Sequence, residues 1–400
     1  MKLFFYELRK TFLRRYVIVL LLLLSVLDVV KIGVDRYQGN IDLITREGTA
    51  NQKAFEQFYR NTKGTVTDDT LRFLSEEEQR LGEIYEKRLN YHDPDEVTYS
   101  GNLYEDYRIL EVYIADEFHY VEGYSDYSNR IAALAQENVS YYQDKGNILK
   151  AQENAYIAEN YSSRSIFQFY RTDSVTSYLN IYFSTILIVF MCFLGVAPVF
   201  GAEYDCRMNY LLSTSKKGGL KSTFIKILVS ICYSCGIVLW FCALDFGTYQ
   251  VLCGFEGLDN PIWAVKEFKE SFLNCSIQNF MIREVLLKLL AVVCITLIIL
   301  LLSLLLKKIL HVAVGFLVFL AGWYAAGSFI FSFSRWKMML ALWNPVTLFN
   351  NLKLYQGFHC VEFGNHFILE SSICIIGNAV MAALMMVLIL LIKRRADKCR

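Results

Sequence analysis

The sequence predicts an all-α integral membrane protein, with six transmembrane helices and a helical extracytoplasmic domain inserted between the first and the second helix. Three observations predict this fold class. Six runs of roughly 20 mainly apolar residues recur along the 400-residue chain, and each is long enough to cross a hydrocarbon core about 30 Å thick. One long segment between the first two runs is polar and acidic. The remaining Lys and Arg residues gather in short segments that a six-span topology places on one side.

The first fifteen residues predict an amphipathic helix on the inner membrane surface. Met1, Phe5, Leu8 and Phe12 recur at helical spacing and form one apolar stripe, with basic residues around it. Acidic lipids attract such a basic face. The next apolar run has no small-residue cleavage site after it, which favours an uncleaved signal anchor.

The segment 35–176 contains 26 Asp and Glu residues against 15 Lys and Arg residues, a difference of −11. Thr67 and the two aspartates after it are a helix start signal, for a helix that runs to about residue 90. Tyrosines are frequent in the later part of the segment. We expect their rings to pack and their hydroxyls to face water, with a ligand-binding surface as the alternative. The later helices are expected at 101–122, 128–143 and 147–170.

Five further spans follow the acidic segment. In the two longer segments that connect spans on the outer side, Asn260-Pro261 and Asn344-Pro345 each predict a short helix, because Asn caps a helix start and Pro suits its first turn. All five tryptophans lie in or near the outer half of this topology, as in an interfacial aromatic belt. The expected organisation is an amphipathic helix at 1–15, spans at 16–34, 178–200, 223–246, 285–306, 310–332 and 371–392, an extracytoplasmic domain at 35–176, a cytoplasmic loop at 201–222, outer segments at 247–284 and 333–370, and a basic tail at 393–400.

The distribution of basic residues predicts the orientation. The N-terminus, the loop 201–222, the Lys307-Lys308 turn and the C-terminal tail are all basic. The positive-inside rule places these four segments in the cytoplasm and the acidic domain outside a plasma membrane. The net charge of +1 gives no indication of nucleic-acid binding.

The loop 201–222 reads as a short amphipathic helix between two spans. Tyr204, Met208, Leu211 and Leu212 form an apolar stripe. On another face, Glu203 and Arg207 stand four residues apart, the favourable order for a helical ion pair. Such a helix either docks on a cytosolic partner or rests on lipid headgroups.

This loop resembles the coupling loop of ABC-2 type exporter permeases. The matching pieces are Glu203, the run LLSTSKKG at 211–218 and Lys226 at the start of the next span. Arg207 stands where the family often has glycine. The six-span layout, the amphipathic N-terminus, Ser303 before the Lys307-Lys308 turn and Asn344-Pro345 before the last span are similar to the same family.

The resemblance implies the transmembrane subunit of an ATP-driven exporter that moves an amphiphilic peptide, lipid or antibiotic outward. It implies two partners, a cytosolic ABC ATPase and a second permease copy or paralogue. The chain has no Walker A motif, so we expect no enzymatic activity and no cofactor of its own, with ATP bound by the partner. Glu203, Tyr204, Arg207, Met208, Leu211 and Leu212 would contact the ATPase. The alternatives are a mechanotransmission-type ABC membrane protein, which usually has four spans, and a membrane sensor that acts through a partner.

Three ionisable residues, Asp28, Asp245 and Lys288, lie near the outer ends of apolar runs. Snorkelling of these side chains to the interface is the simplest expectation, and a functional role is the alternative. The stretch 359–366 contains His359, Cys360, Glu362 and His366, which match no tight zinc spacing. The sequence leaves open whether any disulfide joins Cys253, Cys275 and Cys360.

Overall fold

In the part of the chain that the structure describes, the secondary structure is almost entirely helical, with two small two-stranded sheets. Six helical segments are long and apolar enough to cross a membrane, so the predicted all-α membrane fold with six spans is confirmed at this level. The six segments are Arg15–Tyr37, Asp173–Tyr204, Leu220–Leu252, Ile277–Leu306, Ile309–Gly327 and Glu370–Arg395. The computed structural model describes residues 2–12, 14–86, 98–205, 219–328, 335–363 and 366–398.

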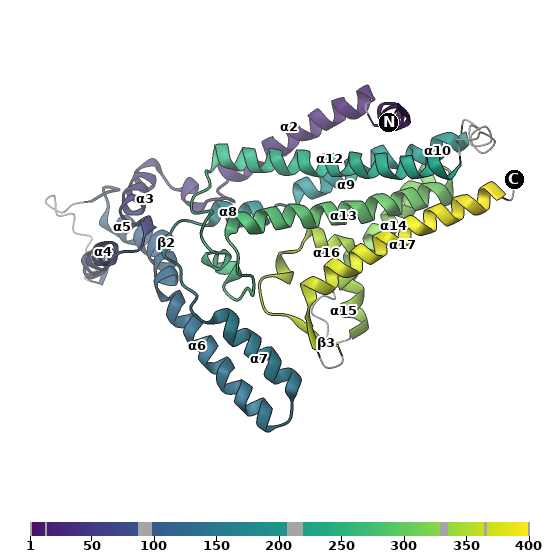
Figure 1. The fold of residues 1–400 in the computed structure, drawn as a ribbon. Coiled ribbons are helices and arrows are strands. Elements are labelled where there is room, and N and C mark those ends of the chain that lie inside the picture. Colours follow the sequence, from purple (N-terminus) through teal and green to yellow (C-terminus); the bar gives the residue numbers. More distant parts are fainter. Residues whose placement is uncertain are drawn as a thin grey trace.

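The apolar helices run alongside one another in an elongated bundle, with both termini at the same end (Figure 1). Helix α13 (Ile277–Leu306) is the central helix, and it packs against α9, α10, α12, α14, α16 and α17. From Cys294 to Leu300 every side chain of α13 is buried, as expected for a helix that is apolar on all sides. The other long helices are α2 (Arg15–Tyr37), α12 (Leu220–Leu252), α14 (Ile309–Gly327) and α17 (Glu370–Lys398).

The second span is broken, although the sequence analysis treated it as one helix. The predicted span at 178–200 lies within the candidate span Asp173–Tyr204, but the structure divides this stretch into three helices that follow one another. Pro198 lacks the N–H that would bind the carbonyl of Leu194, so the chain starts a new helix there. The three helices are α8 (Asp173–Leu179), α9 (Phe183–Val196) and α10 (Pro198–Asp205).

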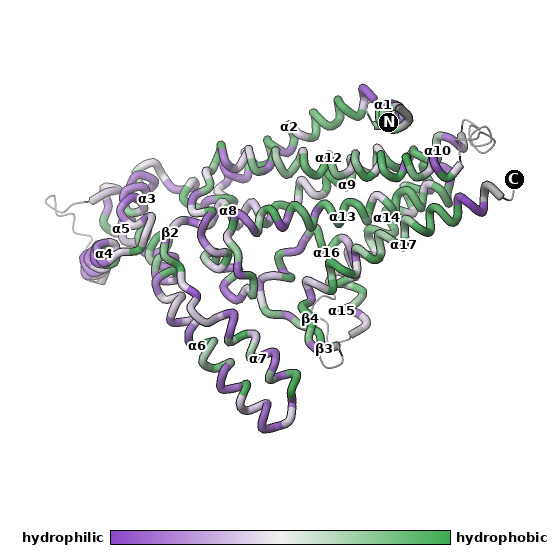
Figure 2. The backbone as a smooth tube through the Cα atoms, in the orientation of Figure 1, coloured by the Kyte–Doolittle hydropathy of each residue, from purple (hydrophilic) through white to green (hydrophobic). Residues whose placement is uncertain are grey.

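Hydropathy divides the molecule along its length. Figure 2 shows hydrophobic residues along the bundle and a mixture of hydrophilic and hydrophobic residues in the helices beside it. Helices α12 and α13 have 33 and 30 residues, so each is about 45–50 Å long at 1.5 Å per residue and exceeds a hydrocarbon core of about 30 Å. Both helices therefore extend beyond the apolar zone toward the helical domain.

The helical domain is built from two parts, a group of short helices and a long hairpin (Figure 1). The predicted start at Thr67 is confirmed, since its Oγ1 accepts from the Thr70 amide at 3.3 Å and Thr70 Oγ1 accepts from the Thr67 amide at 2.8 Å. The short helices are α3 (Thr49–Thr62), α4 (Asp68–Glu86) and α5 (Leu103–Leu110), and the hairpin is α6 (Asp116–Asp144) and α7 (Ile148–Tyr161).

Two predicted helix boundaries in this domain are wrong, and α3 was not predicted. The predicted break between 101–122 and 128–143 does not exist, because α5, the π-turn η2 (Glu111–Ala115) and α6 form one run. Gly123 is tolerated inside that run, since its cost of roughly 1 kcal/mol is small beside the packing of the neighbouring tyrosine. Helix α7 ends at Tyr161 instead of near residue 170. Ser163 has a φ of +62°, and strand β2 (Gln168–Phe169) then pairs with β1 (Gly64–Thr65).

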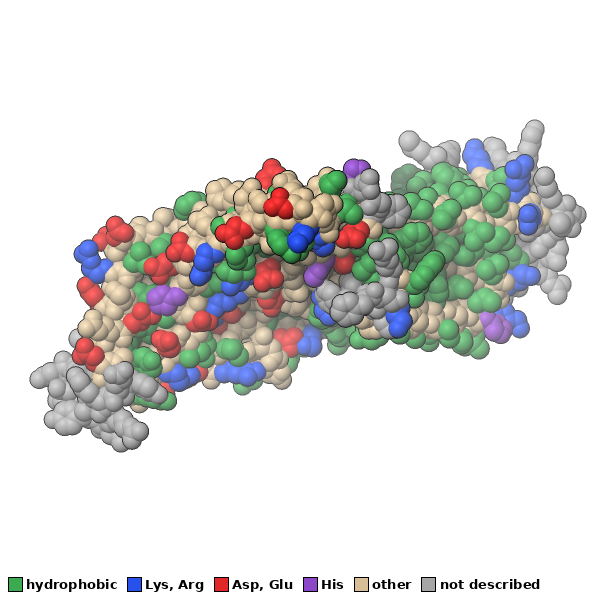
Figure 3. Space-filling model, turned by 90° about the horizontal axis from the view of Figure 1, so that it is seen from below, with side chains coloured by type: hydrophobic (Ala, Val, Ile, Leu, Met, Phe, Trp, Pro, Cys, Tyr) green, Lys and Arg blue, Asp and Glu red, His purple; other side chains and the backbone are tan. Residues whose placement is uncertain are grey.

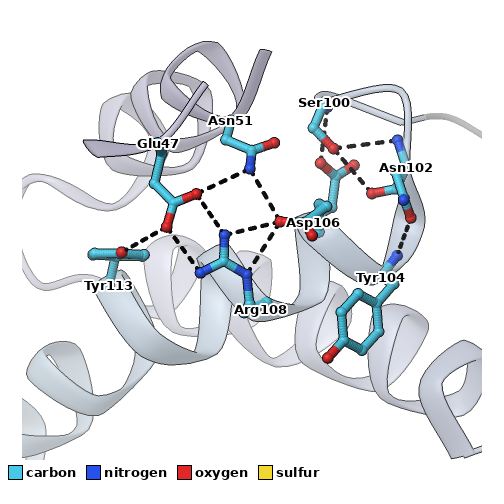
Figure 4. Close-up of polar contacts among 9 residues, drawn as sticks. Glu47, Asn51, Ser100, Asn102, Tyr104, Asp106, Arg108 and Tyr113 are labelled. Atoms are coloured by element: carbon cyan, nitrogen blue, oxygen red, sulfur yellow. Dashed lines mark hydrogen bonds and ion pairs between the residues drawn. The ribbon is translucent and has the colours of Figure 1, made fainter. Parts of the chain in front are cut away.

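A charged network holds α3 against α5 (Figure 4). Arg108 donates through Nη1 and Nη2 to the two carboxylate oxygens of Glu47, at 2.9 and 2.7 Å. The same Nη2 also reaches Glu105 at 2.8 Å. Asn51 donates to Glu47 at 3.2 Å and to Glu105 at 3.0 Å, and the Tyr113 hydroxyl donates to Glu47 at 3.0 Å. Hydrogen bonding from Arg108 lowers the pKa of Glu47 from its ordinary 4.5 to about 2.

Glu47→Gln should loosen this part of the domain and remove part of its sensitivity to acid. Because the folded-state pKa lies below the ordinary value, the stabilisation is present above about pH 5 and is lost as the pH falls toward 2. We expect a cost of about 1 kcal/mol near neutral pH, since the network is partly exposed. Hydrogen exchange of the α3 amides, corrected for the intrinsic effect of pH, measures this loss of stability. The exposed Glu76→Gln is the control, and equal behaviour of the two variants would contradict the assignment.

The hairpin docks on the connecting segment 253–276, which joins α12 to α13. On α6, Tyr120 donates its hydroxyl to the carbonyl of Trp263 at 2.6 Å, and Tyr124 donates to the carbonyl of Lys269 at 3.0 Å. The expectation of water-facing hydroxyls is wrong for these tyrosines. The rings of Tyr124 and Trp263 are also parallel, with centroids 6.3 Å apart. Trp263 is thus buried beneath the domain and does not belong to an aromatic belt.

The two Asn-Pro signals have different outcomes. Asn344 accepts from the amide of Val346 at 2.9 Å and Pro345 opens α16 (Pro345–Phe349), which confirms the second signal. The first is wrong, because Asn260 donates to the Gln168 carbonyl at 3.0 Å and the chain forms the 3-10 turns η3 (Ile262–Ala264) and η4 (Lys266–Phe268). The segment 333–370 also contains an unpredicted hairpin of β3 (Cys360–Phe363) and β4 (His366–Leu369).

Candidate functional site

The bundle has two chemically different ends. We call the end that carries α1 (Lys2–Thr11), α10, the α13–α14 turn and the end of α17 the basic end, and the opposite end the domain end. In Figure 3 the acidic and basic side chains are both spread over the helical domain, hydrophobic side chains cover the bundle, and the charged side chains at the basic end are basic. This separation of charge by an apolar zone is the pattern expected of a membrane protein.

The predicted coupling loop lies at the basic end, between α10 and α12. Glu203 and Tyr204 belong to the last turn of α10. The other four predicted contact residues, Arg207, Met208, Leu211 and Leu212, lie outside the residues that the structure describes. The structure therefore defines the base of the loop and leaves its predicted apolar stripe a prediction.

A buried ion pair closes the base of the loop. Glu203 of α10 accepts from the ammonium of Lys226 on α12, and their side chains are 8% and 4% exposed. Lys226 also lies over the ring of Phe200, 5.5 Å from its centroid, and Glu7 of α1 adds a second negative charge nearby. The sequence suggested Arg207 as the partner of Glu203. Lys226 stands at the start of an apolar run, where an unpaired charge is costly, and this was the signal available in the sequence for such a partner.

Helix α10 is also fastened to α13. Ser303 donates its hydroxyl to the carbonyl of Ala197 at 2.7 Å, and the amide of Gly201 donates to Ser303 at 3.3 Å. A Cβ on Gly201 would lie 2.9 Å from the carbonyl oxygen of Lys307, so only glycine permits this approach. Lys307 in turn places its ammonium 5.4 Å from the ring centroid of Tyr204. The α13–α14 turn thus contacts the start of the loop.

The N-terminal helix braces the same end, which agrees with the predicted amphipathic helix. Phe12 is buried, and its ring stacks on Tyr233 of α12 with centroids 4.3 Å apart. Phe5, on the predicted apolar stripe, is 62% exposed and available to lipid. Together these contacts tie α10, α12, α13 and α1 into one unit, so a displacement of the loop would be transmitted to the long helices.

The other sequence candidates lie elsewhere. Cys253, Cys275 and Cys360 are unpaired. His359 immediately precedes β3, and His366 is the first residue of β4, where it pairs with Phe363 of β3. Within the described ranges, no three His, Cys, Asp or Glu side chains converge in a way that could hold a metal ion.

The three ionisable residues in the apolar runs do not snorkel. Asp28, Asp245 and Lys288 are 0%, 1% and 5% exposed, so the expectation that they reach the interface is wrong. Because these residues stand near the ends of apolar runs, the sequence suggested that they reach the membrane–water interface. Helices α12 and α13, however, continue past the apolar zone and bury these side chains against neighbouring helices. Burial of this kind is costly and marks a second polar site, at the domain end.

Scans of protein-family models, curated proteins and solved structures found no match to this chain.

Proposed function

We propose that this chain is the transmembrane subunit of an ATP-driven exporter of the ABC-2 type, in which the basic end faces the cytoplasm and the helical domain lies outside. The supporting observation is the construction of the basic end. Glu203 of α10 and Lys226 of α12 join the two described flanks of the predicted basic loop, and α12 is one of the long helices of the bundle. A separate ABC ATPase would bind the loop 206–218, and a second permease copy or a paralogue would complete the transporter.

Helix α12 connects the loop at the basic end to the helical domain at the other end. It begins beside the loop, at Leu220, and ends at Leu252, where the connecting segment 253–276 receives the α6–α7 hairpin. A displacement of the loop would therefore move both the spans and the helical domain. Such a movement suits export of an amphiphilic peptide, lipid or antibiotic, which must leave the bilayer on the domain side.

The replacement of Leu211 and Leu212 by Asp tests the proposal. We expect normal insertion and loss of co-purification with a soluble Walker A ATPase, sought among the products of the neighbouring genes, because two buried charges in a docking face cost several kcal/mol. Asn209→Asp adds a charge to another face of the same segment and should retain the ATPase. Retention by the double variant, with intact ATPase and membrane protein, would show that the loop is not the docking element.

A mechanotransmission role is the second candidate. The firm docking of the hairpin on the connecting segment favours it, since motion of α12 would move the domain. The six candidate spans favour the exporter, because proteins of the mechanotransmission type usually have four. Accumulation of an amphiphile in inverted vesicles, dependent on ATP, would distinguish the exporter from a protein that performs mechanical work or one that senses through a partner.

A further inference from the structure

A groove in the side of the bundle is lined almost entirely by apolar side chains. It has a volume of about 480 Å³ and lies between α9, α13, α14 and α16. Ile186, Phe190 and Leu317 on its wall are 64%, 46% and 65% exposed, so the groove opens sideways out of the bundle. On α14 the lining extends from Ala313 to Tyr324, about 16 Å of helix at 1.5 Å per residue. This length accommodates most of a lipid acyl chain.

A second, more polar pocket adjoins the groove at the end of α14. It has a volume of about 230 Å³, and both Tyr324 and Val346 line it as well as the groove. Lys353 lines this pocket and is exposed, and in the described parts of the chain no acidic side chain pairs with it. Asn350 also lines it, and its Oδ1 accepts from the Tyr182 hydroxyl at 3.1 Å, while its amide N–H groups have no partner among the described residues. The two pockets together form one amphipathic site, with an apolar groove and a cationic end that offers hydrogen-bond donors.

We infer that this site binds an anionic phospholipid of the leaflet at the domain end, with one acyl chain in the groove and its phosphodiester on Lys353 and Asn350. A phosphodiester supplies the negative charge and the acceptor oxygens that the ammonium and the amide lack. Basic pockets between membrane-spanning helices commonly bind anionic headgroups. None of the described residues that line the two pockets is acidic, so a headgroup that also carries a positive charge gains less.

A second copy of this chain is a less suitable occupant of the groove. The exposed side chains of the spans are mainly apolar. A span of a second copy could therefore fill the groove, but it would cover the Lys353 ammonium without a counter-charge, which is costly. A phospholipid satisfies both parts of the site at once. The inference goes beyond the proposed transport function, and its test needs neither an ATPase nor transport.

Native mass spectrometry of the full chain, stripped of lipid in a mild detergent, tests the cationic end of the site. The probes are palmitoyl-oleoyl phosphatidylglycerol and phosphatidylcholine, which have the same chains and differ in headgroup charge. We expect the first phosphatidylglycerol to bind roughly fivefold more tightly, the contribution of about one lysine near a membrane surface. Lys353→Met should remove this preference, and Lys353→Arg should keep it, because the guanidinium also binds a phosphodiester. Lys308→Met removes an exposed lysine at the basic end and should keep the preference too.

Two phenylalanine variants on α14 test the groove. Ala313→Phe places a ring in the groove, at the end remote from the headgroup, and should weaken binding of both lipids roughly fivefold or more. Val314→Phe adds a ring one position along, where the side chain is 56% exposed and does not line the groove, and should bind within about twofold of wild type. Thermal unfolding in the same detergent shows whether each variant is folded.

Three results would overturn the inference. The first is equal affinity of the wild type for the two lipids, and the second is a preference that survives Lys353→Met. The third is unchanged lipid binding by folded Ala313→Phe. If that variant instead dissociates a dimer and keeps its lipid, the groove belongs to a second copy of the chain.

Discussion

Lys226→Met should destabilise the protein strongly, because it leaves Glu203 buried without its partner. Both side chains are almost fully shielded, and Glu7 lies near the same ammonium, so removal of the lysine leaves uncompensated negative charge at the basic end. Breaking one partner of a buried ion pair costs about 3–5 kcal/mol. Loss of the Glu203–Lys226 ion pair should also free the base of the loop and reduce co-purification with the proposed ATPase.

Thermal unfolding of the full chain in detergent measures this effect, and Lys221→Met is the matched control. Lys221 is exposed on the first turns of the same helix, so its loss should change the free energy of unfolding by less than about 0.5 kcal/mol. The double variant Glu203→Gln with Lys226→Met should recover part of the loss, since the carboxylate that loses its direct partner is then neutral. If Lys226→Met and Lys221→Met unfold alike, the pair does not hold the loop.

Arg164→Ala should undock the α6–α7 hairpin from the connecting segment. The guanidinium of Arg164 is buried between the rings of Tyr161 and Trp263, with 4.4 Å to each centroid. It also donates to the carbonyl of Ser271 at 2.7 Å. A hydrogen bond from a charged donor and two cation–π contacts together predict a loss of about 3–4 kcal/mol, concentrated at this interface.

Hydrogen exchange resolves that loss by region. Amides of the connecting segment 253–276 and of α7 should exchange faster, while those at the centre of α13 should not change. Arg130→Ala, an exposed site on α6, is the control for loss of an arginine. Arg164→Lys keeps a cation but loses the planar group that fills the space between the rings, so it should give an intermediate effect. Uniform faster exchange across the bundle would mean that Arg164 supports the whole fold instead of this interface.

The two sites differ in how far the sequence indicated them. At the basic end, Glu203 and Lys226 both stood out as charged residues beside apolar runs, yet the helix spacing suggested Arg207 as the partner of Glu203. At the domain end, Asp28 and Asp245 stood out individually, and position alone suggested an interface. The sequence indicated neither Lys226 as a partner of Glu203 nor the burial of the aspartates, since the neighbours of a buried charge lie on another helix and their register is a property of the packed bundle.

The sequence by itself determined the class of this protein: the six apolar helices, the polar domain after the first of them and the helix starts at Thr67 and Asn344. These features depend on hydropathy and capping within one segment of roughly 20 residues or fewer, which packing rarely reverses. Tertiary structure alone decided the burial of tyrosine hydroxyls against the connecting segment and the burial of Asp28, Asp245 and Lys288 inside the bundle. Those outcomes depend on which faces of distant helices come together, and no local pattern specifies them.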